Sequence, residues 1–252
     1  MNETGRSDEK VSISLVFPAY NEAEKLEKAV EEALKILKRL PHSYEIIIAE
    51  DGSTDGTDKI AYELSKKLPN VKHLHSDKRL GRGLALKRAF ENSKGDILVF
   101  MDVDLATDIR HLEALIDSIR EGYDVAIGSR TLPESRVKRT FSRKIASKMY
   151  NLTVRLLLGS KISDHQCGFK AFSRAVFLPI LEETKATHWF WDTEILVRAS
   201  RRGCKIKELP VEWKGGKDTK VHLFKDSLTM GWQALKFWWI LKRESLANNP
   251  TN

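Results

Sequence analysis

Three aspartates follow a short run of apolar residues near the middle of the chain. In ILVFMDVDLATD (97–108), five apolar residues lead into Asp102, Asp104 and Asp108. A run with no polar residue at alternate positions predicts a parallel strand that is covered on both faces. Ligands of open α/β sheets bind beyond the carboxyl ends of such strands. We therefore predict that these carboxylates line a cleft.

Similar polar segments follow other predicted strands: PAYNE (18–22), EDGSTDGT (50–57) and GSRT (128–131). Paired carboxylates at the end of a buried strand repel one another and lose hydration, so a bound cation compensates them. These segments contain no His or Cys, so we predict a hard cation with oxygen ligands, Mg²⁺ or Mn²⁺. Because the chain has neither GxxxxGK[ST] nor GxGxxG, phosphates would be held by the metal and by arginine.

The elements that would position these residues alternate in the first half of the chain, which is typical of an α/β fold with a mostly parallel sheet. Strands are predicted at 12–17, 44–49, 71–75, 96–101 and 123–128, with helices near 22–39, 56–68, 81–94 and 108–120. The second half is less regular. We predict helices near 141–158, 190–201 and 224–243, and strands near 168–173 and 205–213.

The two predicted helices at 141–158 and 224–243 combine apolar and basic residues. In the first, apolar residues recur at helical spacing while basic residues share another face. The second contains FWWIL (237–241) flanked by basic residues, a composition typical of a helix that lies in a membrane interface. The alternative is that its aromatic residues pack on the domain or in a dimer interface.

Charge divides the chain unevenly. Residues 1–130 contain 20 Lys/Arg and 24 Asp/Glu, a net charge of −4, whereas residues 131–252 contain 23 and 11, a net charge of +12. A basic half suits a phosphate-rich ligand, an anionic membrane or a nucleic acid. A nucleic-acid-binding module would leave the acidic strand ends without a role, so we expect no nucleic-acid partner. Two cysteines exclude a disulfide scaffold and indicate a cytosolic setting.

The motifs VFPAYNE, EDGSTDGT, Asp-Val-Asp and GSR, in this order, resemble those of family 2 glycosyltransferases, which are inverting enzymes with the GT-A fold that use nucleotide-diphosphate sugars. DHQCGFKAF (164–172) and HWFWDTEIL (188–196) resemble segments of the dolichyl-phosphate β-glucosyltransferases. Dolichyl-phosphate mannose synthases are near neighbours, but Ala106 stands where they have Gln. The resemblance implies a disordered N-terminus at 1–10, a GT-A domain at 11–222, and an amphipathic, membrane-associating helix and tail at 223–252.

The resemblance also implies roles for individual residues. Asp102 and Asp104 would bind the metal, and Asp104, Arg130 and Asp192 would be catalytic, with Asp192 facing the sugar or the acceptor. Arg143 and Lys220 would bind the acceptor phosphate. The nucleotide would be bound by Pro18, Tyr20, Asn21, Glu22, Glu50, Asp51 and Asp102.

The implied reaction transfers a hexose, with glucose from UDP-glucose favoured, to polyprenyl (dolichyl) phosphate. We expect the hexosyltransferase to be peripheral on the cytoplasmic face of a membrane. Two alternatives stay open: a GDP-mannose-using mannose synthase, and a transferase acting on a sugar hydroxyl in glycan or polysaccharide synthesis. In the latter, Asp192 would be a base that deprotonates the acceptor.

Overall fold

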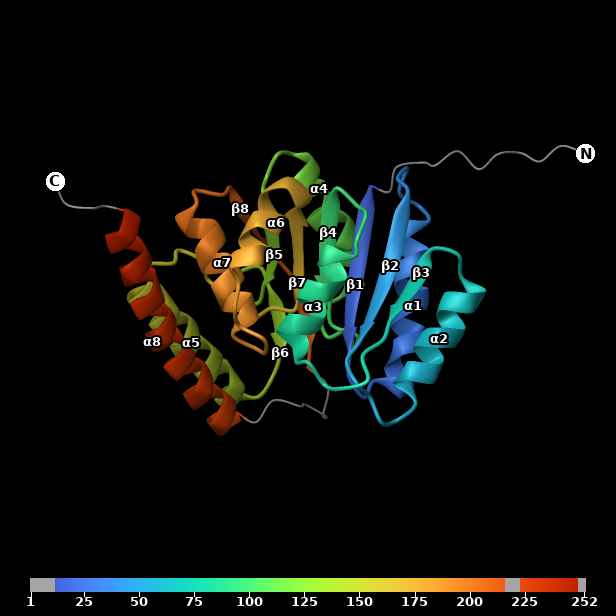
Figure 1. Ribbon diagram of the computed structural model, residues 1–252, viewed down its shortest axis with the longest axis horizontal. Coiled ribbons are helices and arrows are strands. Elements are labelled where there is room, and N and C mark those ends of the chain that lie inside the picture. Colours follow the sequence, from blue (N-terminus) through green and yellow to red (C-terminus); the bar gives the residue numbers. More distant parts are fainter. Residues whose placement is uncertain (1–11, 216–222, 249–252) are drawn as a thin grey trace, which may run out of the picture.

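The computed structural model describes residues 12–215 and 223–248, and the side chains of residues 12–215 and 229–244 (Figure 1). Lys220 therefore lies outside the described residues, as does the predicted disordered N-terminus. The strands are β1 (Ile13–Ala19), β2 (Tyr44–Glu50), β3 (Val71–Leu74), β4 (Ile97–Met101), β5 (Val125–Ser129), β6 (Arg136–Lys138), β7 (Phe169–Ser173), β8 (Ile206–Pro210) and β9 (Glu212–Lys214).

The helices complete the α/β architecture that the sequence predicts. They are α1 (Ala23–Leu37), α2 (Thr57–Lys67), α3 (Arg82–Glu91), the 3₁₀ turn η1 (Ile109–His111), α4 (Leu112–Arg120), α5 (Phe141–Leu158), α6 (Arg174–Glu183), α7 (Trp191–Arg201) and α8 (Leu223–Asn248). The predicted helices of the first half thus all form, within a few residues of their expected bounds.

A seven-stranded sheet in the order β3-β2-β1-β4-β7-β5-β8 forms the centre of the molecule. Its strands are parallel except β7, which runs antiparallel to both β4 and β5. The carboxyl ends of β1, β2, β4 and β5 consequently meet at one edge (Figure 1). This common edge brings together the polar segments that the sequence separates by up to a hundred residues.

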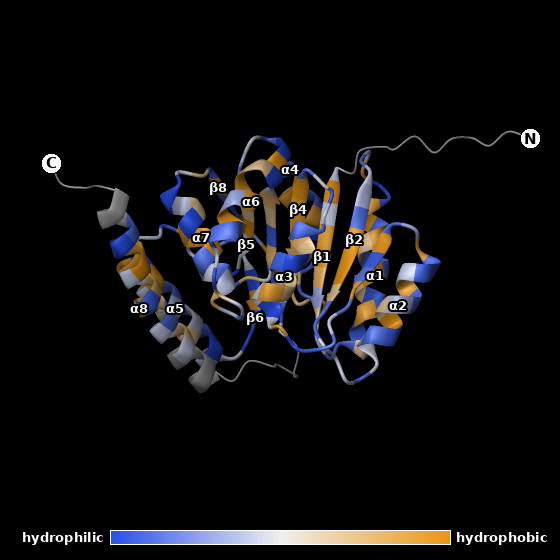
Figure 2. Ribbon diagram, viewed as in Figure 1, coloured by the Kyte–Doolittle hydropathy of each residue, from blue (hydrophilic) through white to orange (hydrophobic). Residues whose placement is uncertain are grey.

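Apolar residues cover both faces of the sheet, as the continuous apolar strands predict (Figure 2). On one face the strands pack against α1, α2 and α4, and on the other against α3, α6 and α7. The second face contains an aromatic cluster in which Phe90 lies between Phe100, Phe177 and Trp191. This burial on both sides fixes the strand ends and therefore the side chains that follow them.

The structure corrects two expectations for the second half. The single strand predicted at 205–213 is two strands, because the chain leaves the large sheet after Pro210, which has no N–H to donate to a ladder. Its continuation, β9, pairs instead with β6 in a separate two-stranded sheet. Helix α6 was not predicted; it contains Pro179, a residue that normally disfavours a helix interior.

Helices α5 and α8 lie side by side at one end of the molecule (Figure 1). They share a small core with α7, to which Val154, Val197 and Phe237 contribute. The predicted apolar stripe of α5 does not form that core: Phe141 is 76% exposed and Leu156 is 78% exposed. Among the described helices, none combines the length and apolar character needed to cross a membrane.

Candidate active site

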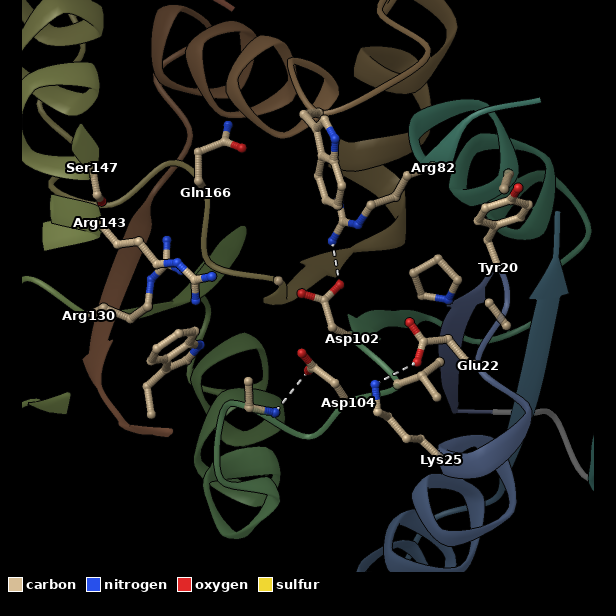
Figure 3. Close-up of a pocket in the computed structure, with 18 of the residues that line it drawn as sticks. Tyr20, Glu22, Lys25, Arg82, Asp102, Asp104, Arg130, Arg143, Ser147 and Gln166 are labelled. Carbon is tan, nitrogen blue, oxygen red and sulfur yellow. Dashed lines mark hydrogen bonds and ion pairs between the residues drawn. The ribbon is translucent and has the colours of Figure 1, made fainter. Parts of the chain in front are cut away.

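A cavity of about 330 Å³ opens at the carboxyl edge of the sheet and extends to α5 and α8 (Figure 3). Acidic residues from the ends of β1, β2 and β4 line one side, and arginines from the β5 end and the start of α5 line the other. The predicted residues that line it are Pro18, Tyr20, Glu22, Asp51, Asp102, Asp104, Arg130 and Arg143. Most of the nucleotide-side and phosphate-side predictions thus converge on one space.

Asp102 is held at the tip of β4 by the segment that precedes β7. Its backbone N–H donates to the Gly168 carbonyl at 3.0 Å. A Cβ on residue 168 would lie only 1.8 Å from Asp102 Oδ2, so only glycine leaves room for this carboxylate. Gly168 is therefore required for the position of Asp102, and this explains the Gly in DHQCGFKAF.

Asp104 projects into the same space from the turn after β4. The turn contains Leu105 at a φ of 50°, and Asp104 Oδ1 accepts from the Ala106 N–H at 3.0 Å. Burial in the concave site and the negative charge of Asp102 raise the pKa of Asp104. A carboxylate whose charged form is disfavoured in this way gains most from a nearby cation.

The carboxylate pair fits a hard divalent cation. Among the described residues, one oxygen of each carboxylate accepts a hydrogen bond. Asp102 Oδ1 accepts from Arg82 at 2.8 Å, and Asp104 Oδ1 accepts from the Ala106 N–H. A smaller recess of about 10 Å³, lined also by Thr107 and Gly168, adjoins the two carboxylates. An all-oxygen donor set of this kind suits Mg²⁺ or Mn²⁺.

The wall near β1 and β2 is rigid. The two oxygens of Asp51 accept from the N–H groups of Leu80 and Gly81 at 2.6 and 3.0 Å, while burial raises the pKa of this carboxyl. The Arg79 guanidinium lies 3.9 Å from the centre of the Tyr20 ring. This wall thus presents an aromatic ring with a guanidinium group packed on it, beside a carboxylate held by two backbone N–H groups.

Two predicted nucleotide-binding residues do not line the cavity. Asn21 lies in the tight turn after β1, at a φ of 52°, and its side-chain oxygen accepts from the Thr54 N–H. Glu50 is buried and accepts from the Ser53 N–H at 2.5 Å. Both side chains therefore contact the loop that follows β2 rather than the cavity.

Three arginines, Arg130, Arg139 and Arg143, form the opposite wall. Arg130 donates twice to the buried Asp164, at 2.7 and 2.9 Å, which keeps its guanidinium charged and holds the pKa of Asp164 well below its usual range. Among the described residues, the buried Nε of Arg139 has no hydrogen-bond partner, and burial together with the charge of Arg130 lowers the pKa of Arg139. Three arginines arranged in this way suit an anion that binds between their guanidinium groups.

Asp192, predicted to face the sugar or the acceptor, lies behind the cavity wall. Its side chain is 3% exposed and does not line the cavity. One oxygen accepts from Lys170 at 2.6 Å and the other from Arg82 at 2.5 Å. Asp192 is thus a buried counter-ion that positions Arg82, which in turn contacts Asp102.

Arg82 is the main site residue that sequence reasoning missed. It bridges Asp192 and Asp102 at the start of α3 and lines the cavity. A Cβ at either flanking glycine would clash: at Gly81 with His188, and at Gly83 with Trp191. The signal was present as Gly-Arg-Gly at a predicted helix start, because two glycines there indicate a close approach of the backbone to another segment.

Comparison with known proteins agrees with this geometry. The family model described as Glycosyl transferase family 2 matches residues 14–180. Glycosyltransferase AglD of Haloferax volcanii is 50% identical over 234 residues, which are 92% of this chain and 38% of that protein. The dolichyl-phosphate beta-glucosyltransferase of Saccharomyces cerevisiae is 31% identical over 245 residues, 89% of this chain and 73% of that one. The chain thus spans well under half of AglD.

Solved structures share the fold. Glucosyl-3-phosphoglycerate synthase from Mycobacterium tuberculosis, in complex with UDP, superposes with a TM-score of 0.68 at 20% identity, over 90% of this chain and 79% of that one. Mannosyl-3-phosphoglycerate synthase from Rubrobacter xylanophilus gives 0.68 at 18% identity, over 93% and 75%. The prediction of a GT-A fold with a mostly parallel sheet is confirmed.

Proposed function

The chain belongs to glycosyltransferase family 2, and on this basis we propose that it transfers a hexose, with glucose favoured, from a nucleotide-diphosphate sugar to polyprenyl (dolichyl) phosphate. The observation that carries this proposal is one cavity with carboxylates on one side and three arginines on the other. A nucleotide diphosphate with its metal ion suits the carboxylates, and an acceptor phosphate suits the arginines. Transfer between the two requires that they bind next to each other.

The donor would bind on the acidic side. Tyr20, Arg79 and Asp51 suit the base and ribose, and Asp102 and Asp104 would hold Mg²⁺ or Mn²⁺ against the diphosphate. The metal, when bound, supplies Lewis-acid stabilisation of the leaving diphosphate. UDP is favoured because several relatives are named as glucosyltransferases and a fold neighbour, glucosyl-3-phosphoglycerate synthase, was solved with Mn²⁺ and UDP-glucose.

The acceptor side supports a phosphate rather than a sugar hydroxyl. A hydroxyl needs a base, whereas a phosphate monoester with a second pKa of about 6 already carries an attacking oxyanion at neutral pH. The described lining residues from α5 and the segment before β7 are arginine, serine, tyrosine, glutamine and small residues. With Asp192 held by Lys170 and Arg82, no carboxylate or imidazole among them is placed to act as that base.

The outer face of α5 and α8 supports a lipid-linked acceptor. It exposes apolar side chains close to the arginine wall, because Arg143, Ser147 and Met230 of the same two helices line the cavity. The exposed residues are Phe141, Ile145, Met149, Leu152, Leu156, Trp232, Leu235 and Trp239. Exposed apolar residues on helices that also carry basic residues suit an anionic membrane, so we propose peripheral attachment at the cytoplasmic surface.

Label transfer tests the reaction. The protein is incubated with Mn²⁺ or Mg²⁺, one radiolabelled nucleotide sugar at a time, and either polyprenyl phosphate or 3-phosphoglycerate. We expect glucose from UDP-glucose to enter the organic phase with polyprenyl phosphate and to stay unreacted with 3-phosphoglycerate. Transfer to 3-phosphoglycerate alone would contradict the proposed acceptor. A preference for GDP-mannose would contradict the proposed donor.

Vesicle sedimentation tests the attachment. Replacing both Met149 and Leu156 by Glu removes exposed apolar contacts and adds charges that anionic lipid repels. We expect binding to anionic vesicles to fall at least about tenfold, since each buried apolar side chain contributes about 1.5–3 kcal/mol. Tyr62→Glu, at an exposed apolar residue of α2, serves as the control and should bind normally. Equal sedimentation of the double variant would exclude this face as the anchor.

A further inference from the structure

Two histidines and a glutamate meet at the free edge of the sheet, outside the cavity. Each of Glu50, His73 and His75 offers one ligand atom, and these atoms all lie within 4.8 Å of one another. Glu50 Oε2 is 2.6 Å from His75 Nδ1. None of the three lines the cavity described above. The cluster therefore needs an explanation of its own.

Strand pairing places the three side chains on one face. β3 is the edge strand, and His73 pairs with Ile48 of β2 in the parallel register. Because side chains alternate along a strand, Glu50 projects to the same side as Ile48, and His75 to the same side as His73. The register of the sheet thus places Glu50 and His73, and His75 directly follows the last residue of β3.

A second observation points to a ligand. His73 Nε2 is buried and has no hydrogen-bond partner in the described structure, although a buried polar atom normally has one. The charged neighbours of His75 are Asp77, which lies 3.3 Å from His75 Nε2, and Arg88, which donates to the His75 carbonyl at 2.8 Å.

We propose that Glu50, His73 and His75 form a binding site for Zn²⁺ or a similar transition-metal ion. Imidazole and carboxylate ligands suit zinc, and ligand bonds of about 2.0–2.2 Å in a tetrahedral site require ligand atoms roughly 3.4 Å apart. The observed separations, from 2.6 to at most 4.8 Å, bracket that value. His75 is 47% exposed, which gives the ion access from solvent and leaves a coordination position for water.

The site would fasten the loop that borders the nucleotide wall. His75 begins the segment that leads to Arg79, Leu80 and Gly81, and these residues contact Tyr20 and Asp51. Joining His75 to Glu50 through a metal would fix the start of this segment on β2. The ion would thus be structural, and distinct in ligands and location from the Mg²⁺ or Mn²⁺ at Asp102 and Asp104.

Zinc binding to the full chain, without an affinity tag and in excess Mg²⁺, tests the proposal. We expect one Zn²⁺ per chain after gel filtration, a raised Tm, and visible absorption bands when Co²⁺ replaces zinc. His73→Gln and His75→Gln should each weaken zinc binding at least about tenfold, since even indirect partners of a metal ligand typically contribute about 10–100-fold. These readouts do not require glycosyl transfer.

Two control variants make the result specific. His42→Gln removes a histidine next to the start of β2, at the opposite end of that strand, and Asp104→Asn removes a ligand of the other predicted metal site. Both should bind zinc as the wild type does. A wild-type chain that retains no zinc, or equal retention by His73→Gln, His75→Gln and His42→Gln, would overturn the proposal.

Discussion

The acidic side of the cavity is built on strand ends, whereas on the arginine side only Arg130 follows a strand, and the other two arginines lie on a loop and a helix. Asp51 and Asp102 directly follow β2 and β4, whose residues are almost fully buried. Arg139 and Arg143 lie around the start of α5, of which only Asn151, Val154 and Leu158 are buried. The acidic side is thus fixed by the core, while the arginine side depends on a few specific contacts.

The contacts that join the two sides are ionic and buried. Asp192 holds Arg82, which reaches Asp102, while Lys170 bonds both Asp192 and the Cys167 carbonyl. Asp164 holds Arg130. His165 Nδ1 donates to the side-chain oxygen of Asn151 of α5, and its Nε2 is bonded to the Ser160 hydroxyl. Changes at the buried residues of this set that do not line the cavity, such as Asp192, Asp164 and His165, should affect stability, and changes at the cavity surface should affect turnover.

The largest effect on turnover is expected from Asp104→Ala. Loss of a ligand on the acidic side removes stabilisation of the leaving diphosphate worth several kcal/mol, so we expect a loss on the order of 10³-fold. Stability should change by less than about 0.5 kcal/mol, because the side chain lines the cavity and is not packed in the core. Asp108→Ala, at an aspartate bonded to Arg110, is the control and should retain activity. Full turnover in excess chelator would contradict the metal role.

The largest effect on stability is expected from Asp192→Asn. The substitution leaves Lys170, which is fully buried, and Arg82 without their counter-ion, and breaking such a pair costs about 3–5 kcal/mol. Urea unfolding measures the change. Asp117→Asn, which breaks an exposed pair with Arg120, should cost less than about 1 kcal/mol. An unfolding free energy unchanged by Asp192→Asn, together with loss of the acidic limb of the rate profile, would restore Asp192 as a base.

Mild acid should lower the free energy of unfolding through His165, which is bonded to Asn151 of α5. Burial lowers the pKa of this imidazole to about 4, whereas in the unfolded chain it is about 6.5. Between these values the unfolded chain binds the proton and the folded chain does not, so the free energy of unfolding falls as pH drops from about 6.5 to about 4, by roughly 3 kcal/mol. Unfolding curves at pH 7 and 4.5 should show a smaller drop for His165→Gln. An identical drop in both proteins would exclude this histidine as the cause.

The smallest effect is expected from Arg143→Ala on the arginine side. Loss of one charge-assisted hydrogen bond, about 1.5 kcal/mol, should raise the KM for polyprenyl phosphate about tenfold and leave the KM for the nucleotide sugar unchanged. Arg155→Ala is the matched control, because it removes a basic residue of α5 that does not line the cavity. If the substitution raised the KM for the nucleotide sugar more than the KM for the acceptor, Arg143 would instead be assigned to donor binding.

The sequence by itself determined where the carboxylates on the acidic side of the cavity lie. Continuous apolar runs specify buried parallel strands, and the carboxyl ends of such strands must share an edge, so the strand pattern alone places Asp51, Asp102 and Asp104 together. The same reasoning predicted the helices of the first half and the cation with oxygen ligands. Local pattern and local chemistry agree there, because each residue is positioned by the strand that precedes it.

Only the tertiary structure decided the rest. Asp192 and Arg82 are 110 residues apart, and nothing in either local sequence indicates that they pair. The apolar stripe of α5 looks like a core face, yet Val154 and Leu158 pack inward and the stripe stays exposed. Which side of an amphipathic helix is buried, and which partner a buried charge takes, depend on segments distant in the sequence, since burial and ion pairing are set by what the fold brings into contact.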